Sequence, residues 1–106
     1  MTSLDDGYDV KRTVENAKKL IEDTQVLALM LPRGTANSEA LLPMLTEKRA
    51  PLLASVGGSK VLHDPPNRFL FIIRPHYRTE AERIVGQLTA QGITKIGVVY
   101  TDDAFG

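Results

Sequence analysis

Cysteine, net charge and long apolar runs are all missing from this chain of 106 residues. Without cysteine there is no disulfide framework and no thiolate chemistry. The 13 basic and 13 acidic residues cancel, so charge gives no reason to expect nucleic acid or an anionic membrane surface as a partner. The longest apolar runs, at 26–32 and 69–73, are strand-sized and fall well short of the roughly 18 residues of a membrane span. Residues 1–6 lack the basic region and the apolar core of a signal peptide.

What the chain does contain is an alternation of helical and strand patterns. Asp9 is placed to cap a helix that runs to about Glu22, with apolar residues at helical spacing. Further helices are predicted at 37–48, where Pro43 should introduce a kink, and from residue 79. The predicted strands are 26–31, 51–56, 69–74 and 95–100. Because strands separated by helices imply right-handed crossovers, we predict an α/β fold with a partial parallel sheet flanked by helices.

The helix from residue 79 has the clearest boundaries in the sequence. Thr79 and Glu82 have the spacing of a capping box, and Gly92 stands where helices commonly end. The helix is expected to bury its apolar residues, which are Ala81, Ile84, Val85 and Leu88.

Both ends of the chain look cut. It opens on a turn and a helix with no strand before them, and it closes on a loop at 101–106. Four strands also make a thin core for this length. We therefore expect a fragment of a larger protein or a truncated reading frame.

Loops that follow strands are the places where ligands bind in open parallel sheets. Two of these loops, at 32–38 and 55–59, are rich in glycine and hydroxyl side chains. Such residues let backbone N–H groups approach an anion, and the helix that follows favours negative charge. A small carboxylate ligand is one interpretation. The other, stronger on spacing alone, is that the hydroxyl residues cap a helix and the glycines form a turn.

No arrangement of residues indicates catalysis. Asp5, Asp6 and Asp9 lack the spacing of a calcium loop and its closing glutamate. His63 and His76 lie in separate loops without a nucleophile motif nearby, which favours solvated loop histidines. We therefore predict no catalytic residue, no metal, no cofactor and no enzymatic activity.

Several segments, taken in order, resemble a known family. They are residues 4–9, 11–16 with 19–21, Gly34-Thr35 with Ser38 and Leu42-Pro43, Arg74 with Tyr77, and 96–100 with 102–106. Together they resemble the type I periplasmic solute-binding proteins for branched-chain amino acids, which deliver ligands to an ABC transporter. The resemblance covers essentially the whole chain and implies a flavodoxin-like lobe, a periplasmic location and an ABC permease as partner.

The resemblance also implies how the chain is divided and which residues meet the ligand. Residues 1–75 would belong to the first ligand-binding lobe, without its first strand and helix. Residues 76–106 would be the crossover helix and the first strand of the second lobe. The implied ligand is a small carboxylate, an amino acid such as leucine, isoleucine or valine. Its implied contacts are Thr35, Val56, Gly58 and Phe105.

Two further expectations follow from the resemblance. A ligand-sensing or regulatory domain of the same fold is the alternative function. In the family another strand lies beside the one at 26–31, and its loss would expose a flat apolar edge that recruits a second chain. We therefore expect a homo-oligomer, unless the helix at 9–22 covers this edge within one chain.

Overall fold

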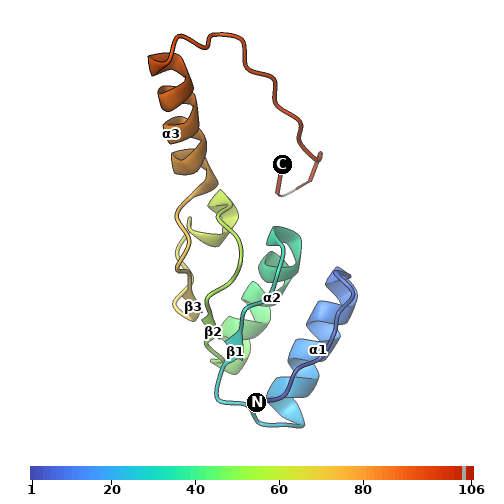
Figure 1. Ribbon diagram of the computed structural model, residues 1–106. Helices are drawn as coiled ribbons and strands as arrows, with labels where there is room; N and C mark the ends of the chain where they lie inside the picture. The colour runs from blue at the N-terminus through green and yellow to red at the C-terminus, as the bar shows by residue number, and fades with distance from the viewer. Residues whose placement is uncertain (104) are drawn as a thin grey trace.

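The computed structural model describes residues 1–103 and 105–106. The elements follow in the order α1 (Val10–Glu22), β1 (Leu29–Met30), α2 (Thr35–Lys48), β2 (Leu52–Leu53), the 3-10 turn η1 (Lys60–Leu62), β3 (Leu70–Phe71) and α3 (Tyr77–Ala90). The molecule is elongated, 56 × 26 × 23 Å, with α3 extending away from the sheet (Figure 1). None of the helices in the described residues is both long and apolar enough to cross a lipid bilayer.

The three strands form a parallel sheet in the order β1-β2-β3, which confirms the predicted α/β class. Leu52 lies opposite Leu29 on one side and opposite Leu70 on the other. Each strand is shorter than predicted. Leu31 and Ala54, which follow β1 and β2, both have a φ of 55°. This left-handed backbone turns the chain out of the extended conformation, and so it ends each strand early.

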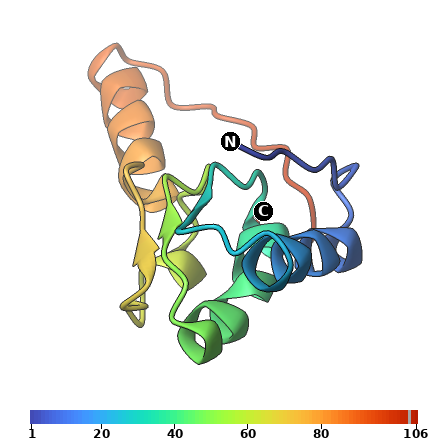
Figure 2. The ribbon, with the colours of Figure 1, turned by 90° about the horizontal axis from the view of Figure 1, so that it is seen from below.

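The core lies between the sheet and the first two helices, which lie side by side (Figure 2). It consists of buried apolar side chains from α1, α2 and two of the strands, namely Ala17, Leu29, Leu41, Leu45 and Leu52. The predicted apolar face of α1 is confirmed, because Val14, Leu20 and Ile21 pack against this cluster. The helix α2 starts at Thr35, two residues earlier than predicted, and continues through Pro43 to Lys48.

The predicted start and burial of α3 are wrong. The helix begins at Tyr77 with His76 as its N-cap residue, so Thr79 lies inside the first turn and does not cap it. No residue of α3 is buried, and Ile84 and Val85 are exposed. The reason is visible in Figure 1, where α3 stands apart from the sheet and from both other helices. An amphipathic pattern predicts a helix, but burial needs a partner element.

The strand predicted at 95–100 is not formed in this structure. These residues have no regular secondary structure, and Ile96, Val98, Val99 and Tyr100 are exposed. A strand needs a neighbouring strand to pair its N–H and C=O groups. Residues 95–100 run from the far end of α3 without reaching the edge of the sheet (Figure 1).

A polar network ties the amino-terminal segment to α1 and α2. Asp9 caps α1 as predicted, because its carboxylate accepts a hydrogen bond from the Arg12 N–H at 2.8 Å. The buried Thr13 hydroxyl donates to the Asp6 carboxylate at 2.5 Å and accepts from the buried Asn37 amide at 2.7 Å. The Thr13 hydrogen bond, together with the Tyr8 N–H, lowers the pKa of Asp6. Thr13 thus joins three segments of the chain.

We expect Thr13→Val to destabilise the fold by about 1–3 kcal/mol, because it leaves the buried Asn37 amide without its acceptor. Urea unfolding measures this loss, and Thr24→Val, at an exposed position, is the control. A carboxyl group with a lowered pKa stabilises the fold above its ordinary pKa, and this stabilisation is lost as the pH falls through the lowered value. Stability should therefore fall less steeply from about pH 5 to about pH 3 in Thr13→Val than in the parent chain. Equal slopes would contradict the role given to Asp6.

Candidate functional site

The loops after β1 and β2 meet at the carboxyl edge of the sheet. Arg33 and Val56 form a parallel bridge there, and the Val56 N–H donates to the Pro32 carbonyl at 3.0 Å. Gly34 follows with a φ of 98°, which L side chains rarely adopt. A Cβ at Gly34 would also lie 3.0 Å from the Tyr8 hydroxyl. This crowded turn sets the position at which α2 begins.

The amino terminus of α2 is open. No side chain caps it, and its first backbone bond runs from the Ser38 N–H to the Gly34 carbonyl at 3.1 Å. The N–H groups of the three preceding residues therefore lie ahead of the helical ladder. Thr35 is 2% exposed, and its hydroxyl has no hydrogen-bond partner in the described chain. By contrast, the buried hydroxyls of Ser38 and Ser55 share a hydrogen bond of 2.8 Å.

The Gly57-Gly58 turn packs directly beside this helix end. A Cβ at Gly57 would lie 3.8 Å from the Thr35 hydroxyl and only 2.8 Å from Leu62 Cδ1. A Cβ at Gly58 would lie 2.5 Å from the Pro75 carbonyl oxygen. Glycine is therefore needed at Gly58, where the obstructing atom is backbone, whereas at Gly57 the end of the Leu62 side chain could shift. The N–H groups of Gly57 and Gly58 donate to no acceptor among the described residues.

A hollow of about 560 Å³ adjoins the same turn. It lies between the segment 58–64, the first turns of α3 and the chain end, and its lining includes Gly58, Tyr77 and Phe105. The Tyr77 N–H donates to the Gly58 carbonyl at 2.7 Å, and the Phe105 ring meets the Tyr77 ring edge-on at 5.4 Å. An aromatic wall thus stands beside the glycine turn.

The structure brings only two of the four expected ligand contacts together at one hollow. Gly58 and Phe105 line the same hollow. Thr35 does not line it, but its hydroxyl lies beside Gly57. Val56 is 40% exposed, and its N–H is already bonded to Pro32, so this group is not available to a ligand.

The contact between His63 and His76 at this site was not predicted from the sequence. The rings of His63 and His76 stack at 3.9 Å, so describing them as separate solvated histidines is wrong. Burial lowers the pKa of His63, and the neighbouring His76 lowers it further. His63 Nε2 is buried and has no hydrogen-bond partner among the residues that the structure describes. The two residues are far apart along the chain, and no spacing motif connects them.

Arg74 and Tyr77 form a second feature at the base of α3. The Arg74 guanidinium donates to both carboxylate oxygens of Glu80, at 3.1 and 3.2 Å, which raises the pKa of Arg74. It also lies 5.0 Å from the centre of the Tyr77 ring. These contacts hold the first turn of α3 beside the hollow. The described residues hold no group of three or more acidic or histidine side chains that could bind a metal ion.

The whole chain, residues 1–106, matches the family described as periplasmic binding protein. The chain belongs to this family. A solved structure of a substrate-binding periplasmic protein from Ralstonia solanacearum is similar, with 33% identity over 94% of this chain and a TM-score of 0.85. A possible leucine/isoleucine/valine-binding protein from Rhodopirellula baltica SH 1 is 29% identical over 84% of this chain, with a TM-score of 0.77. No curated protein matches.

The chain spans 28% of the length of the Ralstonia protein and 24% of the Rhodopirellula protein. The loops described above therefore belong to a member of the periplasmic binding protein family. The parallel sheet of this chain is consistent with one lobe of that fold.

We expect Gly58→Ala to destabilise the junction between the glycine turn and α3. The added methyl group would collide with the Pro75 carbonyl, so the backbone has to move, at a cost of about 1–3 kcal/mol. Gly86→Ala is the matched control, because a Cβ at Gly86 meets nothing within 4 Å. In the middle of α3 that change should stabilise by about 0.5–1 kcal/mol. Urea unfolding of both variants checks the prediction, and a neutral Gly58→Ala would contradict the packing described here.

Proposed function

We propose that this chain is part of a substrate-binding protein that captures a small carboxylate ligand for uptake by an ABC transporter. The observation that carries the proposal is the buried, unpartnered hydroxyl of Thr35 at the open amino terminus of α2. A buried hydroxyl without a hydrogen bond costs free energy. A bound acceptor removes that cost.

A carboxylate suits this place better than a neutral group. The N–H groups in the first turn of α2 and the partial positive charge of the helix end favour an anion. Gly57, beside the Thr35 hydroxyl, and Gly58 after it have backbone N–H groups that donate to no acceptor among the described residues. No carboxylate side chain among the described residues bonds to Thr35 Oγ1, and the acceptor that we propose for it is the carboxylate of the ligand.

The ligand we propose is an amino acid such as leucine, isoleucine or valine. The Rhodopirellula relative is described as a possible leucine/isoleucine/valine-binding protein, which supports this class. In this chain Phe105 and Tyr77 offer apolar surface at the hollow next to Gly58. Together with Thr35 and the backbone N–H groups of Gly57 and Gly58, they would form one part of the binding surface. We propose no catalytic step.

We further propose that residues 1–75 belong to the first lobe and 76–106 to the start of the second. The sheet, α1 and α2 share one core, whereas α3 contributes no buried residue. This division supports a lobe boundary near His76. The proposed location is the periplasm, with an ABC permease as partner, as expected for a family of periplasmic binding proteins. A ligand-sensing domain of the same fold would use the same site, and genes for a permease and an ATPase beside this one would favour transport.

In the full-length protein, Thr35→Ala should weaken binding of leucine by at least about 1 kcal/mol, because a hydrogen bond to a charged carboxylate is lost. Calorimetry measures the change, with Thr24→Ala at an exposed position as the control. Unchanged affinity for leucine, isoleucine and valine would remove Thr35 from the site.

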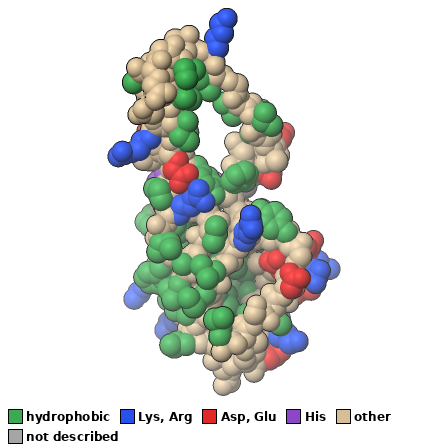
Figure 3. All heavy atoms as spheres, in the orientation of Figure 1, with side chains coloured by type: hydrophobic (Ala, Val, Ile, Leu, Met, Phe, Trp, Pro, Cys, Tyr) green, Lys and Arg blue, Asp and Glu red, His purple; other side chains and the backbone are tan. Residues whose placement is uncertain are grey.

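We also propose that the 106-residue chain forms a homo-oligomer on its own. The strand β1 is at the edge of the sheet, and Leu27, Met30 and Leu31 around it are exposed because α1 packs on α2 instead of covering them. Figure 3 shows hydrophobic side chains gathered over the sheet. An apolar edge with unpaired backbone groups favours pairing with a second chain.

Light scattering at micromolar concentration should therefore give a mass above the 11.7 kDa of one chain. A lysine on an edge strand opposes pairing, so Met30→Lys should shift the chain toward the monomer. Ile84→Lys, on the exposed face of α3, should leave the mass unchanged if the edge is the interface. A monomeric parent chain would contradict the proposal.

A further inference from the structure

A second hollow, of about 670 Å³, lies at the opposite edge of the sheet from the candidate ligand site. It is formed by the end of α2 and by the segment that leads into β3. Its lining residues are Thr46, Arg49, Pro66, Asn67, Arg68 and Phe69. The lining therefore contains two guanidinium groups and no carboxylate.

Neither guanidinium is neutralised by the protein. Among the described residues, Arg49 and Arg68 form no ion pair, whereas Lys48 beside them binds Glu22 at 2.9 Å and Glu47 at 3.3 Å. The adjacent carboxylates are thus already engaged. Arg68 lies 5.9 Å from the centre of the Phe69 ring, a contact that leaves its N–H groups free to donate.

The backbone of Arg49 does not explain the choice of arginine. Arg49 ends α2 in the left-handed conformation, with a φ of 52° and its N–H bonded to the Leu45 carbonyl. Glycine is the residue that this position favours, and a side chain here costs free energy. The end of α2 also attracts cations, but Lys48 already occupies its last turn. Neither the backbone conformation nor the charge of the helix end therefore accounts for an arginine side chain at position 49.

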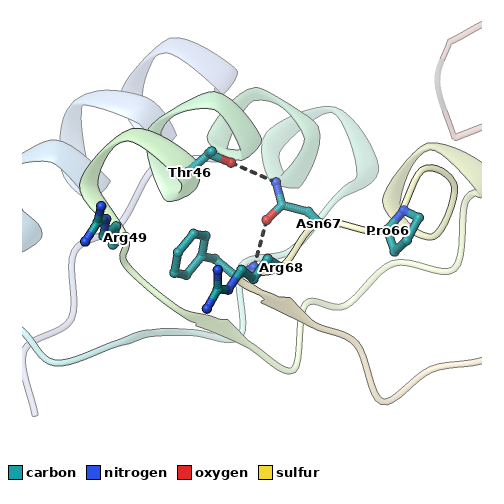
Figure 4. A pocket seen from close by; sticks show the side chains of 6 residues that line it. Thr46, Arg49, Pro66, Asn67 and Arg68 are labelled. Atoms are coloured by element: carbon teal, nitrogen blue, oxygen red, sulfur yellow. Dashed lines mark hydrogen bonds between the residues drawn. The ribbon is translucent and has the colours of Figure 1, made fainter.

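A hydrogen-bonded clamp holds the two arginines at one hollow. The Asn67 amide donates to the Thr46 hydroxyl at 3.2 Å, and its carbonyl oxygen accepts from the Phe69 N–H at 2.9 Å. Figure 4 shows Arg49 at the end of α2 and Arg68 on the segment that leads into β3, with the bond between Thr46 and Asn67 joining the two segments. The clamp thus joins the end of α2, which carries Arg49, to the segment that carries Arg68.

We propose that this hollow is a phosphate-binding site formed by Arg49 and Arg68. Arginine presents planar, paired N–H donors that match the oxygens of phosphate, and two arginines can share one dianion. The phosphate would be either a free phosphate group or the headgroup of an anionic lipid. Both present the same chemistry to the two guanidiniums.

The first test is a titration of the 106-residue chain with inorganic phosphate, followed through the arginine Nε–H signals in ¹H–¹⁵N spectra. The signals of Arg49 and Arg68 should shift and saturate together, and sodium chloride at equal ionic strength should not reproduce the shift. Arg68→Gln should weaken binding about tenfold, the scale expected for a charge-assisted hydrogen bond.

The variant Arg49→Gly tests phosphate binding without an expected loss of folding stability. Glycine suits the left-handed backbone at this position, so the variant should fold at least as well as the parent chain while binding phosphate about tenfold more weakly. Arg83→Gln, at an exposed arginine of α3, is the control and should bind as the parent does. An equal loss in Arg83→Gln would mean non-specific attraction, and it would overturn the proposal, as would the absence of saturation.

A second measurement identifies the source of the phosphate. The chain is sedimented with vesicles of phosphatidylcholine, with and without phosphatidylglycerol. Binding that requires phosphatidylglycerol and is lost in Arg49→Gly assigns the site to a lipid headgroup. Saturable binding of inorganic phosphate without vesicle binding assigns it to a soluble phosphate. If the chain binds neither inorganic phosphate nor the vesicles, the proposed site is rejected.

Discussion

The packing of α2 against the sheet is the contact on which the rest of the structure depends. Leu41 and Leu45 on this helix and Leu52 in the central strand are almost fully removed from solvent. Each such side chain contributes roughly 1.5–3 kcal/mol, so these three account for a large part of a small domain's stability. Because α1 packs on α2 as well, both helices and the sheet keep their places only while this contact holds.

The two ends of α2 differ in how their backbone groups are hydrogen-bonded. At its amino terminus the turn at Gly34 provides no side-chain cap, so first-turn N–H groups and the Thr35 hydroxyl remain without partners. At its carboxyl terminus the Leu45 carbonyl is bonded by the N–H groups of Arg49 and Ala50. The open end suits an anion through the backbone, and the closed end can bind one only through long side chains. The two proposed sites therefore differ in kind because the helix ends differ.

Sequence patterns correctly predicted several features of α1 that depend on residues close together in the chain. The cap at Asp9 and the apolar spacing of α1 are properties of neighbouring residues, and the structure confirms both. One failure is local, because His76 and not Thr79 is the N-cap residue of α3. The other failures concern contacts between distant residues. The apolar face of α3 predicted burial that no element supplies, and the stack of His63 on His76 joins loops that no spacing motif connects. The expectation that Thr35 meets a ligand comes from the family resemblance, since the spacing alone favours a helix cap at this hydroxyl.

The relation between α3 and the sheet rests on a small number of contacts at one place. The Tyr77 N–H bonds to the Gly58 carbonyl, and His76 stacks on His63. Beyond this junction α3 buries no residue, so its direction is set almost entirely by its first turn. Phe105 contacts Tyr77, which means that the aromatic wall of the hollow moves with the same junction. A small change at Gly58 would then be carried along α3 as a change in angle. The residue proposed to meet the ligand therefore also holds the start of α3 against the glycine turn.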